Sequence, residues 1–276
     1  MRQATLIVLL ALGVGCSSQP SKPAEPPPAS HSHPGDTHQG HDMSQMGGRA
    51  GTLMVTTDPA AVQAGQPTRL SLMIHTDSGA ILREFEVVHE QKVHLMVVSA
   101  GLDQFAHIHP EVDSAGNLTI SHVFPTGGTY RLYADYKPVG KPQATAIAEL
   151  QVLGDSPPAP ALIPNAPGSV TGTGLNAHIA IPRAKAGEVT KITFELLDSR
   201  NQPVTDLQPY LGAMGHLVIL SADGKLYVHA HPDEGQTPTG VVQFAAHFPQ
   251  PGIYKAWGQF QRADQVNTVP FVLQVD

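Results

Sequence analysis

Six histidines of this chain form two sets of three that repeat at a constant distance along the sequence. They are His94, His107 and His109, and, 122 residues later in each case, His216, His229 and His231. Both sets have the form His-x12-His-x-His-Pro, and short stretches elsewhere recur at the same separation. A chain that contains one unit twice is expected to fold as two similar modules, each of ordinary domain size.

Short apolar runs separated by turn residues predict that each unit is built from β-strands. Residues 70–74 form one such run, which recurs as residues 192–196, and no long segment shows the 3.6-residue period of a helix. Charged residues are only 14% of the chain, which contains 26 Gly and 25 Pro, as many short strands and turns require. We expect an all-β chain of two tandem immunoglobulin-like or cupredoxin-like β-sandwich modules. The modules span residues 51–153 and 169–276, with a Pro-rich linker at residues 154–168.

The first 16 residues have the pattern of a secretory signal peptide. Arg2 supplies a positive end, and the apolar run at residues 4–14 is too short to span a membrane. The run ends at Cys16 in a segment that resembles a bacterial lipobox, which implies a lipidated Cys16 and a chain anchored in the cell envelope. The alternative is signal cleavage elsewhere, with Cys16 removed. Cys16 is the only cysteine, so no disulfide can form within the chain, and blue-copper sites, which need a Cys ligand, are disfavoured.

Residues 17–50 are expected to form a disordered tether, because they lack the large apolar groups that folding requires. This segment carries histidines and methionines that are candidate metal ligands: His31, His33, His38, His41, Met43 and Met46. Short His-rich tracts are a compositional signal for metal capture, although a polar spacer would have a similar composition.

A hairpin signal predicts that the histidines of the second copy share one face of a sheet. Asp223-Gly224 is typical of a type I′ turn. A turn there pairs residues whose numbers sum to 447, which places His216 opposite His231 and His229 opposite Val218. Because side chains alternate between faces, all three histidines then project from one face. The other face carries an apolar set suited to a core: Leu217, Ile219, Val228 and Ala230.

The first copy, by the same logic, pairs residues whose numbers sum to 203. His94 then faces His109, and Met96 faces His107, which adds a thioether to the three imidazoles. Met214, two residues before His216, is a secondary candidate in the second copy. Two alternatives remain: half-exposed strand histidines, or histidines bonded to the turns before Pro110 and Pro232. Histidines without an aligned repeat partner rank lower as candidate ligands. Two of them are His122 and His247. The others, His75, His89 and His178, are expected at the surface.

Three segments of the second module resemble an uncharacterised family of bacterial secreted proteins. They are MGHLVILS at residues 214–221, VHAHP at 228–232 and FPQPGIYKAWGQFQ at 248–261. The resemblance implies an association with heavy-metal handling, chiefly of copper, in the cell envelope. The general architecture is also similar to that of cupredoxin-like sandwiches.

Taken together, the residues predict an envelope-anchored lipoprotein that binds metal ions for buffering, scavenging or delivery. Imidazole with thioether suits copper, and three imidazoles suit zinc as well. Expected partners are metal ions and a metal efflux or delivery protein, with membrane contact through the lipid anchor only. The net charge of −7 does not indicate the basic surface that binds nucleic acid. The alternatives are a structural or protein-interaction module without metal, and an enzyme with an open metal position. No nucleophile or general-base motif supports the enzyme, so we expect a non-catalytic chain.

Overall fold

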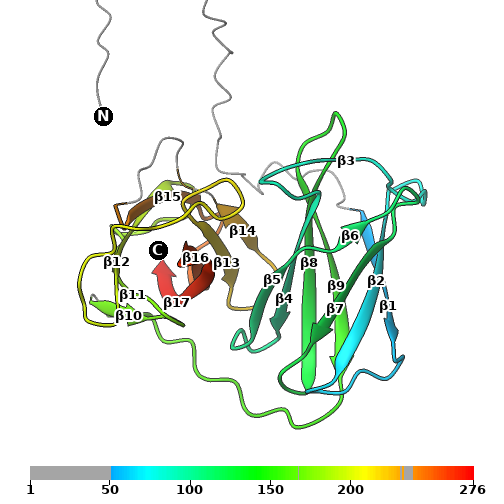
Figure 1. The fold of residues 1–276 in the computed structure, drawn as a ribbon, viewed down its shortest axis with the longest axis horizontal. Coiled ribbons are helices and arrows are strands. Elements are labelled where there is room, and N and C mark those ends of the chain that lie inside the picture. Colours follow the sequence, from blue (N-terminus) through cyan, green and yellow to red (C-terminus); the bar gives the residue numbers. More distant parts are fainter. Residues whose placement is uncertain (1–50, 167, 231, 233–238) are drawn as a thin grey trace, which may run out of the picture. The chain divides into compact units, whose positions relative to one another are not determined.

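The computed structural model describes residues 51–166, 168–230, 232 and 239–276, which all belong to the same unit of the chain. Every regular element in these residues is a β-strand (Figure 1). Across this described part, no helix has the length and apolar character needed to cross a membrane. The expected signal peptide, Cys16, the tether with its histidines and methionines, and His231 lie outside the described residues.

The first module contains two sheets. One has the strand order β1-β2-β7-β6; in the other, β4 pairs with β5 and β8, and β8 also pairs with β3 and β9. The strands are β1 (Thr52–Asp58), β2 (Pro67–His75), β3 (Phe85–Glu86), β4 (Val93–Ser99), β5 (Phe105–Ile108), β6 (Glu111–Val112), β7 (Leu118–Val123), β8 (Gly128–Pro138) and β9 (Ala144–Val152).

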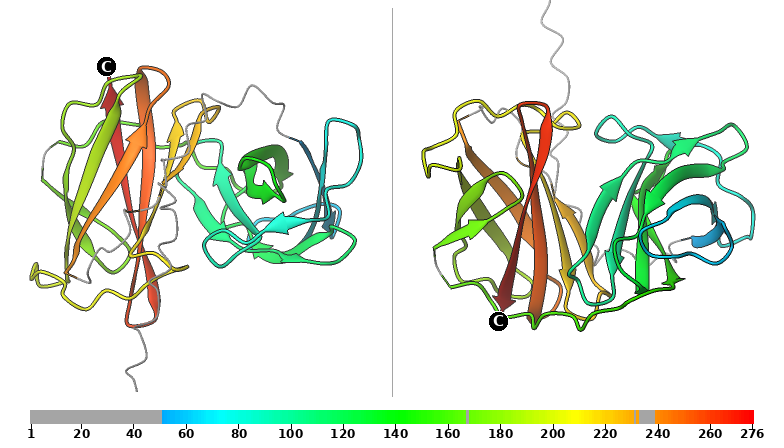
Figure 2. Two further views of the ribbon diagram at one scale, coloured as in Figure 1. Left: turned by 90° about the horizontal axis from the view of Figure 1, so that it is seen from above. Right: turned by 60° about the horizontal axis from the view of Figure 1, so that its bottom comes forward.

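The second module repeats this arrangement with sheets β10-β11-β12-β15 and β14-β13-β16-β17. Its longest ladder joins β16 and β17, the twisted orange-to-red ribbon in Figure 2. The strands are β10 (Ser169–Thr171), β11 (Asn176–Ala180), β12 (Val189–Leu197), β13 (His216–Ser221), β14 (Tyr227–Ala230), β15 (Val241–His247), β16 (Gly252–Arg262) and β17 (Gln265–Val275). The chain is therefore two tandem β-sandwich modules, and the predicted fold class is confirmed.

Each module buries its own core between its two sheets. In β2 the alternating residues Leu70, Leu72 and Ile74 point inward, as the period of two requires. In the second module the predicted inward set of β13 and β14, Leu217, Ile219, Val228 and Ala230, lies in the core. Burial of apolar area at about 25 cal/mol per Å² is the main force that holds each sandwich together.

The predicted register of both histidine hairpins is confirmed. Val218 pairs with His229 in the second module, and Met96 pairs with His107 in the first. The turn type is different from the prediction, because a type I′ turn needs positive φ at both central residues. Only Gly224 has it, at 69°, within a four-residue loop closed by Ser221 and Leu226. That loop is centred on the same two residues, so it sets the same register.

Two dipeptides that recur 122 residues later have structural roles: Ala64-Gly65 with Ala186-Gly187, and Ser99-Ala100 with Ser221-Ala222. The amides of Gly65 and Gly187 donate to the carbonyls of Phe124 and Phe248, at 2.8 Å in both modules. The hydroxyls of Ser99 and Ser221 accept a backbone N–H across their hairpin loops, each at 3.0 Å. Repetition alone therefore does not mark a residue as functional, and the histidines need their own geometric argument.

A third apolar cluster joins the two modules. It consists of buried residues from the outer face of each histidine-bearing sheet, together with Leu102 from the turn between β4 and β5: Met96, Val98, Leu102, Tyr133, Val218, Leu220, Tyr227 and Trp257. Phe105 stacks on Trp257 with ring centroids 4.6 Å apart, and Tyr227 stacks on Tyr133 at 5.5 Å.

These two stacked pairs are equivalent under the repeat. Phe105 corresponds to Tyr227 at the 122-residue separation, and Tyr133 corresponds to Trp257 at 124 residues. Each module therefore offers the same surface to the other, as the two subunits of a twofold dimer do. The histidine hairpins belong to this surface.

Candidate metal centre

Three histidines of the first module converge on one point. Their candidate ligand nitrogens all lie within 4.8 Å of one another. His94 Nδ1 is 3.0 Å from His107 Nε2, and His109 Nε2 is 3.3 Å from the same atom. Two nitrogens that share a tetrahedral ion at 2.0–2.1 Å lie roughly 3.3 Å apart. The spacing therefore suits imidazoles that hold one metal ion.

The outward ring nitrogens of His94 and His107 each donate to an oxygen, which fixes the tautomer of both rings. His94 Nε2 donates to the carbonyl of Val88 at 2.9 Å, and His107 Nδ1 donates to Gln259 Oε1 at 2.7 Å. In a neutral imidazole the other nitrogen then carries a lone pair, and in both rings that nitrogen points at the partner histidine. Metal-binding histidines are oriented in this way by their outer hydrogen bonds.

The second module repeats the arrangement. His216 Nε2 donates to the carbonyl of Tyr210 at 2.8 Å, and His229 Nδ1 donates to Asp135 Oδ2 at 2.9 Å. Tyr210 is the repeat equivalent of Val88, and Asp135 is the equivalent of Gln259. Both modules thus direct Nδ1 of the first histidine and Nε2 of the second inward.

The two sets of histidines face each other across the module interface. The ring of His229 lies 5.4 Å from that of His94 and 5.3 Å from that of His107, centroid to centroid. His216 lies 5.9 Å from His107. The histidine sets of the two modules therefore lie beside one another, because the outer face that carries the histidines in one sheet packs against the same face of the other.

Burial favours the neutral form of His94, His107, His109 and His216. The exposed fraction is 2% for His94, 8% for His107, 0% for His216 and 4% for His229, so they are not half-exposed strand residues. Desolvation lowers the pKa of His94 and of His107. It lowers the pKa of His109 to about 4 and that of His216 to about 3. Neighbouring imidazoles lower the pKa of His107, His109 and His216 further. Neutral imidazole is the form that binds metal.

The remaining candidate residues lie at different distances from this cluster. Met96 is fully buried in the interface, and its sulfur lies 3.8 Å from the hydroxyl of Tyr227. Met214 packs against the core of the second module instead. His122 lies beside Phe124 in the first module, and His178 is exposed and bonded to Ser169.

His89 differs from the expectation that it is a surface residue. Its ring lies 5.7 Å from that of His216, edge to face, so a first-module loop reaches the second module's histidine. His89 has a positive φ of 48°, and its repeat equivalent, Leu211, has 50°. The two loops thus share a backbone shape, and only one carries an imidazole.

Asp135 is the main functional residue that the sequence pattern did not reveal. It is fully buried, and it accepts hydrogen bonds from His229 and from Gln143 Nε2 at 2.7 Å and Tyr227 Oη at 3.3 Å. Burial raises its pKa to about 6, against the opposing effect of the last two hydrogen bonds. The sequence offers one signal for Asp135. It lies two residues after Tyr133, as Gln259 lies two residues after the equivalent Trp257.

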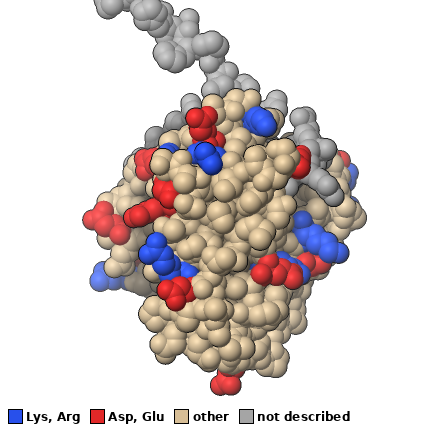
Figure 3. Space-filling view, turned by 90° about the vertical axis from the view of Figure 1, so that its right-hand side faces the viewer, with Lys and Arg blue, Asp and Glu red and all other residues tan. Residues whose placement is uncertain are grey.

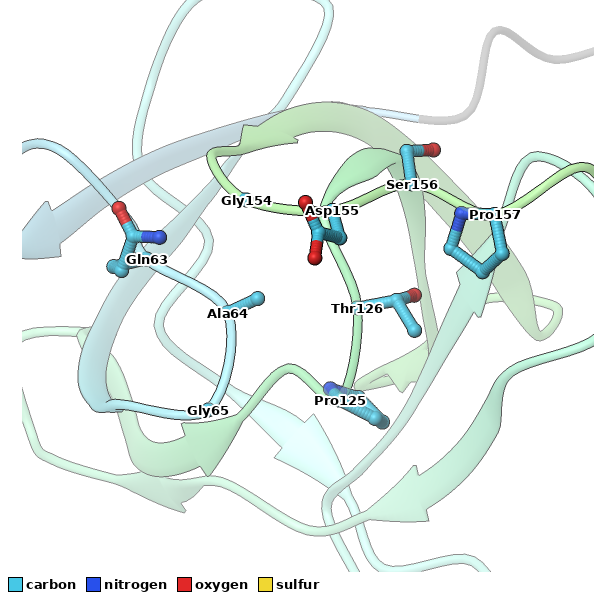
Figure 4. Close-up of a pocket in the computed structure, with 9 residues that line it drawn as sticks. All are labelled: Gln63, Ala64, Gly65, Pro125, Thr126, Gly154, Asp155, Ser156 and Pro157. Atoms are coloured by element: carbon cyan, nitrogen blue, oxygen red, sulfur yellow. The ribbon is translucent and has the colours of Figure 1, made fainter.

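Other surfaces of the described residues carry fewer candidate ligand side chains. A pocket of about 740 Å³ in the first module is lined by loop residues that include Gln63, Thr126, Asp155 and Ser156 (Figure 4). It contains no histidine and only one ionisable side chain. On the face seen in Figure 3, lysines and arginines are interspersed with acidic residues, and no continuous basic patch appears.

The fold and the histidine cluster define a two-module β-sandwich chain with a candidate metal centre at its module interface. A family model matches residues 48–152 and again residues 169–276. The chain belongs to this family, which is described as a domain of unknown function (DUF8832). A comparison with curated proteins gave no match.

Several solved structures of bacterial proteins are similar to this chain. They include the Escherichia coli adhesin FdeC, with 17% identity over 82% of this chain and a TM-score of 0.27. A putative membrane-anchored protein from Corynebacterium diphtheriae has 14% identity over 82% of this chain and a TM-score of 0.26. This chain spans 65% and 59% of those chains, less than two thirds of each. Similarity at this level carries no argument about function.

Proposed function

We propose that this chain is a metal-binding protein whose ion is held by the histidines at the module interface. The observation that carries the proposal is the convergence of His94, His107 and His109, whose ligand nitrogens lie within 4.8 Å. The outer hydrogen bonds to Val88 and Gln259 support it, because they hold the inward nitrogens ready to donate to a cation.

Copper is the favoured ion, and zinc is the second choice. Imidazole binds both, and the general affinity order for divalent ions places copper above zinc. The thioether of Met96 on the same buried face favours copper further, because soft sulfur suits Cu(I). Resemblance of the second module to copper-associated envelope proteins agrees with this choice.

The proposed role is non-catalytic: buffering, scavenging or delivery of metal ions in the cell envelope. Lipidation of Cys16 would anchor the chain, and His31, His33, His38 and His41, with Met43 and Met46, would collect ions ahead of the interface site. A metal efflux or delivery protein is the expected partner. None of these residues lies in the described part of the chain, so they rest on sequence pattern alone.

The test is titration of the full chain with Cu(II) and Zn(II) after treatment with a chelator, with bound metal measured by elemental analysis after dialysis. Replacement of both His107 and His109 by alanine should remove at least one ion per chain. The matched control is His178→Ala, because this exposed histidine lies outside the cluster. Equal metal content in all three proteins would refute the proposal.

A specific observation supports a second candidate, a structural β-sandwich module without metal. The histidines already hydrogen-bond backbone carbonyls and the other module, as the 2.9 Å bond from His229 to Asp135 illustrates. Such bonds help to fix the interface with no ion present. This candidate predicts that no stoichiometric metal binds and that histidine replacement acts on stability alone.

A further inference from the structure

We propose that the two histidine sets form one metal centre that spans both modules, in which His216 and His229 complete the coordination of the ion held by His94 and His107. This inference rests on the proposed metal-binding function. It differs from two independent sites because the ion would then hold the modules together.

The ring spacing supports four imidazoles around one point. For a tetrahedral ion bound at 2.0–2.1 Å, imidazole centroids are expected roughly 5 Å apart. All six pairs among His94, His107, His216 and His229 fall between 5.2 and 6.5 Å. The cross-module pairs His94–His229 and His107–His229, at 5.4 and 5.3 Å, are nearly as close as the pair His94–His107 within the first module, at 5.2 Å.

The outer hydrogen bonds of the histidines also support a shared centre. His107 of the first module is held by Gln259 of the second, and His229 of the second is held by Asp135 of the first. Each of these histidines is therefore oriented by the opposite module, so neither module has a complete site alone. Gln259 and Asp135 are positioning residues in this arrangement, since they act on the ion through an imidazole.

The interface around the cluster would support a shared ion. Apolar residues and two stacked aromatic pairs seal one side of it. His109 is only partly buried and lies 3.3 Å from His107 Nε2, which suits a ligand at the more open edge through which an ion enters. An ion bound there would join residues of both modules and strengthen their contact.

The experiment uses the full chain with the tether histidines His31, His33, His38 and His41 replaced by alanine. Cu(II) is the probe, its stoichiometry is measured by equilibrium dialysis, and pulsed electron paramagnetic resonance counts the coordinated imidazoles. We expect one tightly bound Cu(II) per chain with imidazoles from both modules. His216→Ala, a second-module change, should lower the imidazole count and weaken the binding of that one ion by about tenfold or more. His178→Ala is the control.

Because His229→Ala leaves buried Asp135 without its histidine partner, that variant is a poor test, and His94→Ala serves as the second variant. The melting temperature of each apo variant shows whether it folds. A shared centre requires that His94→Ala and His216→Ala disturb the same Cu(II) signal. Two Cu(II) per chain, with one left unchanged by His216→Ala, would overturn the shared centre and leave metal binding intact. No bound Cu(II) in the parent protein would overturn both.

Discussion

Asp135 and Gln259 occupy equivalent positions in the two modules, and each accepts a hydrogen bond from a histidine of the other module. The distances are similar, 2.9 Å from His229 and 2.7 Å from His107. The two acceptors differ in one respect, because only Asp135 can ionise. The interface is therefore close to twofold in geometry and asymmetric in charge.

Replacing Asp135 by asparagine should stabilise the apo protein at pH 8 and have little effect near pH 4. The pKa of Asp135 is raised to about 6 in the folded state, above the usual 3.8. Its contribution to stability is therefore present below about pH 4 and is lost as the pH rises through 6. The expected gain at pH 8 is at most about 3 kcal/mol, measured by chemical unfolding with a chelator present.

The reciprocal change, Gln259→Glu, gives the control. It places a second carboxyl group at the equivalent buried position and should destabilise the protein more at pH 8 than at pH 4. A gain from Asp135→Asn that is the same at both pH values would contradict the assignment of the raised pKa.

The apo protein should lose stability as the pH falls from about 6.5 to 4. The pKa values of His109 and His216 are lowered to about 4 and about 3. Over this range the unfolded chain binds protons that the folded chain does not, which favours unfolding on acidification. Asp135 acts in the opposite direction over the same range and offsets part of the loss.

His216→Asn tests the histidine contribution. The wild-type protein should lose about 2 to 3 kcal/mol more than the variant between pH 7.5 and 4.5, because the variant lacks one buried imidazole. The measurement is the free energy of chemical unfolding at the two pH values. Equal losses of unfolding free energy in the two proteins would show that His216 does not cause the pH dependence.

Gly224→Ala should destabilise the module interface more than a matched glycine change elsewhere. At Gly224, φ is +69° and an added Cβ would clash with Arg131 Nη1, which donates to the carbonyl of Asp223. At Gly187, φ is +79° with open space around the Cβ.

Gly187→Ala should cost about 1 kcal/mol for backbone strain alone. Gly224→Ala should cost a further 1 to 2 kcal/mol, roughly the value of a lost hydrogen bond at this contact. Thermal unfolding of both variants measures the difference. Equal losses would mean that the Arg131 side chain moves aside without consequence.

Trp257 should report copper binding through its fluorescence. It is the only tryptophan, it is 3% exposed, and it stacks on Phe105. Val218 pairs with both Trp257 and His229 in adjacent strands, so the indole and that imidazole lie about 10 Å apart, two strand spacings. Paramagnetic Cu(II) should quench the emission strongly, whereas Zn(II) should leave most of it. Undiminished emission at saturating Cu(II) would place the ion away from the interface.

The register and facing of the histidine hairpins were predictable because they depend on local turn chemistry and on the period of two. The core set Leu217, Ile219, Val228 and Ala230 followed from the same rule. What covers the opposite face was not predictable. Histidine and tyrosine on the outer face of a strand are equally compatible with water or with another module.

Asp135 illustrates the same limit. A carboxylate in a strand normally indicates solvent exposure, and nothing local in β8 indicates that Gln143, Tyr227 and His229 surround it. His89 was expected at the surface because its repeat equivalent is Leu211, so the repeat pattern did not mark it. Its neighbour His216 comes from a strand more than a hundred residues away.

The near-twofold interface has a consequence for how the site can change by mutation. In a dimer of identical subunits, every substitution at such a surface appears on both sides at once, so an acid facing one histidine would also face the other. Joining the two copies in one chain removes that constraint, because each half carries its own codons. Only a fused pair can hold such differences between its halves. Here the carboxylic acid at position 135 corresponds to an amide at position 259, and the imidazole at position 89 corresponds to a leucine at position 211.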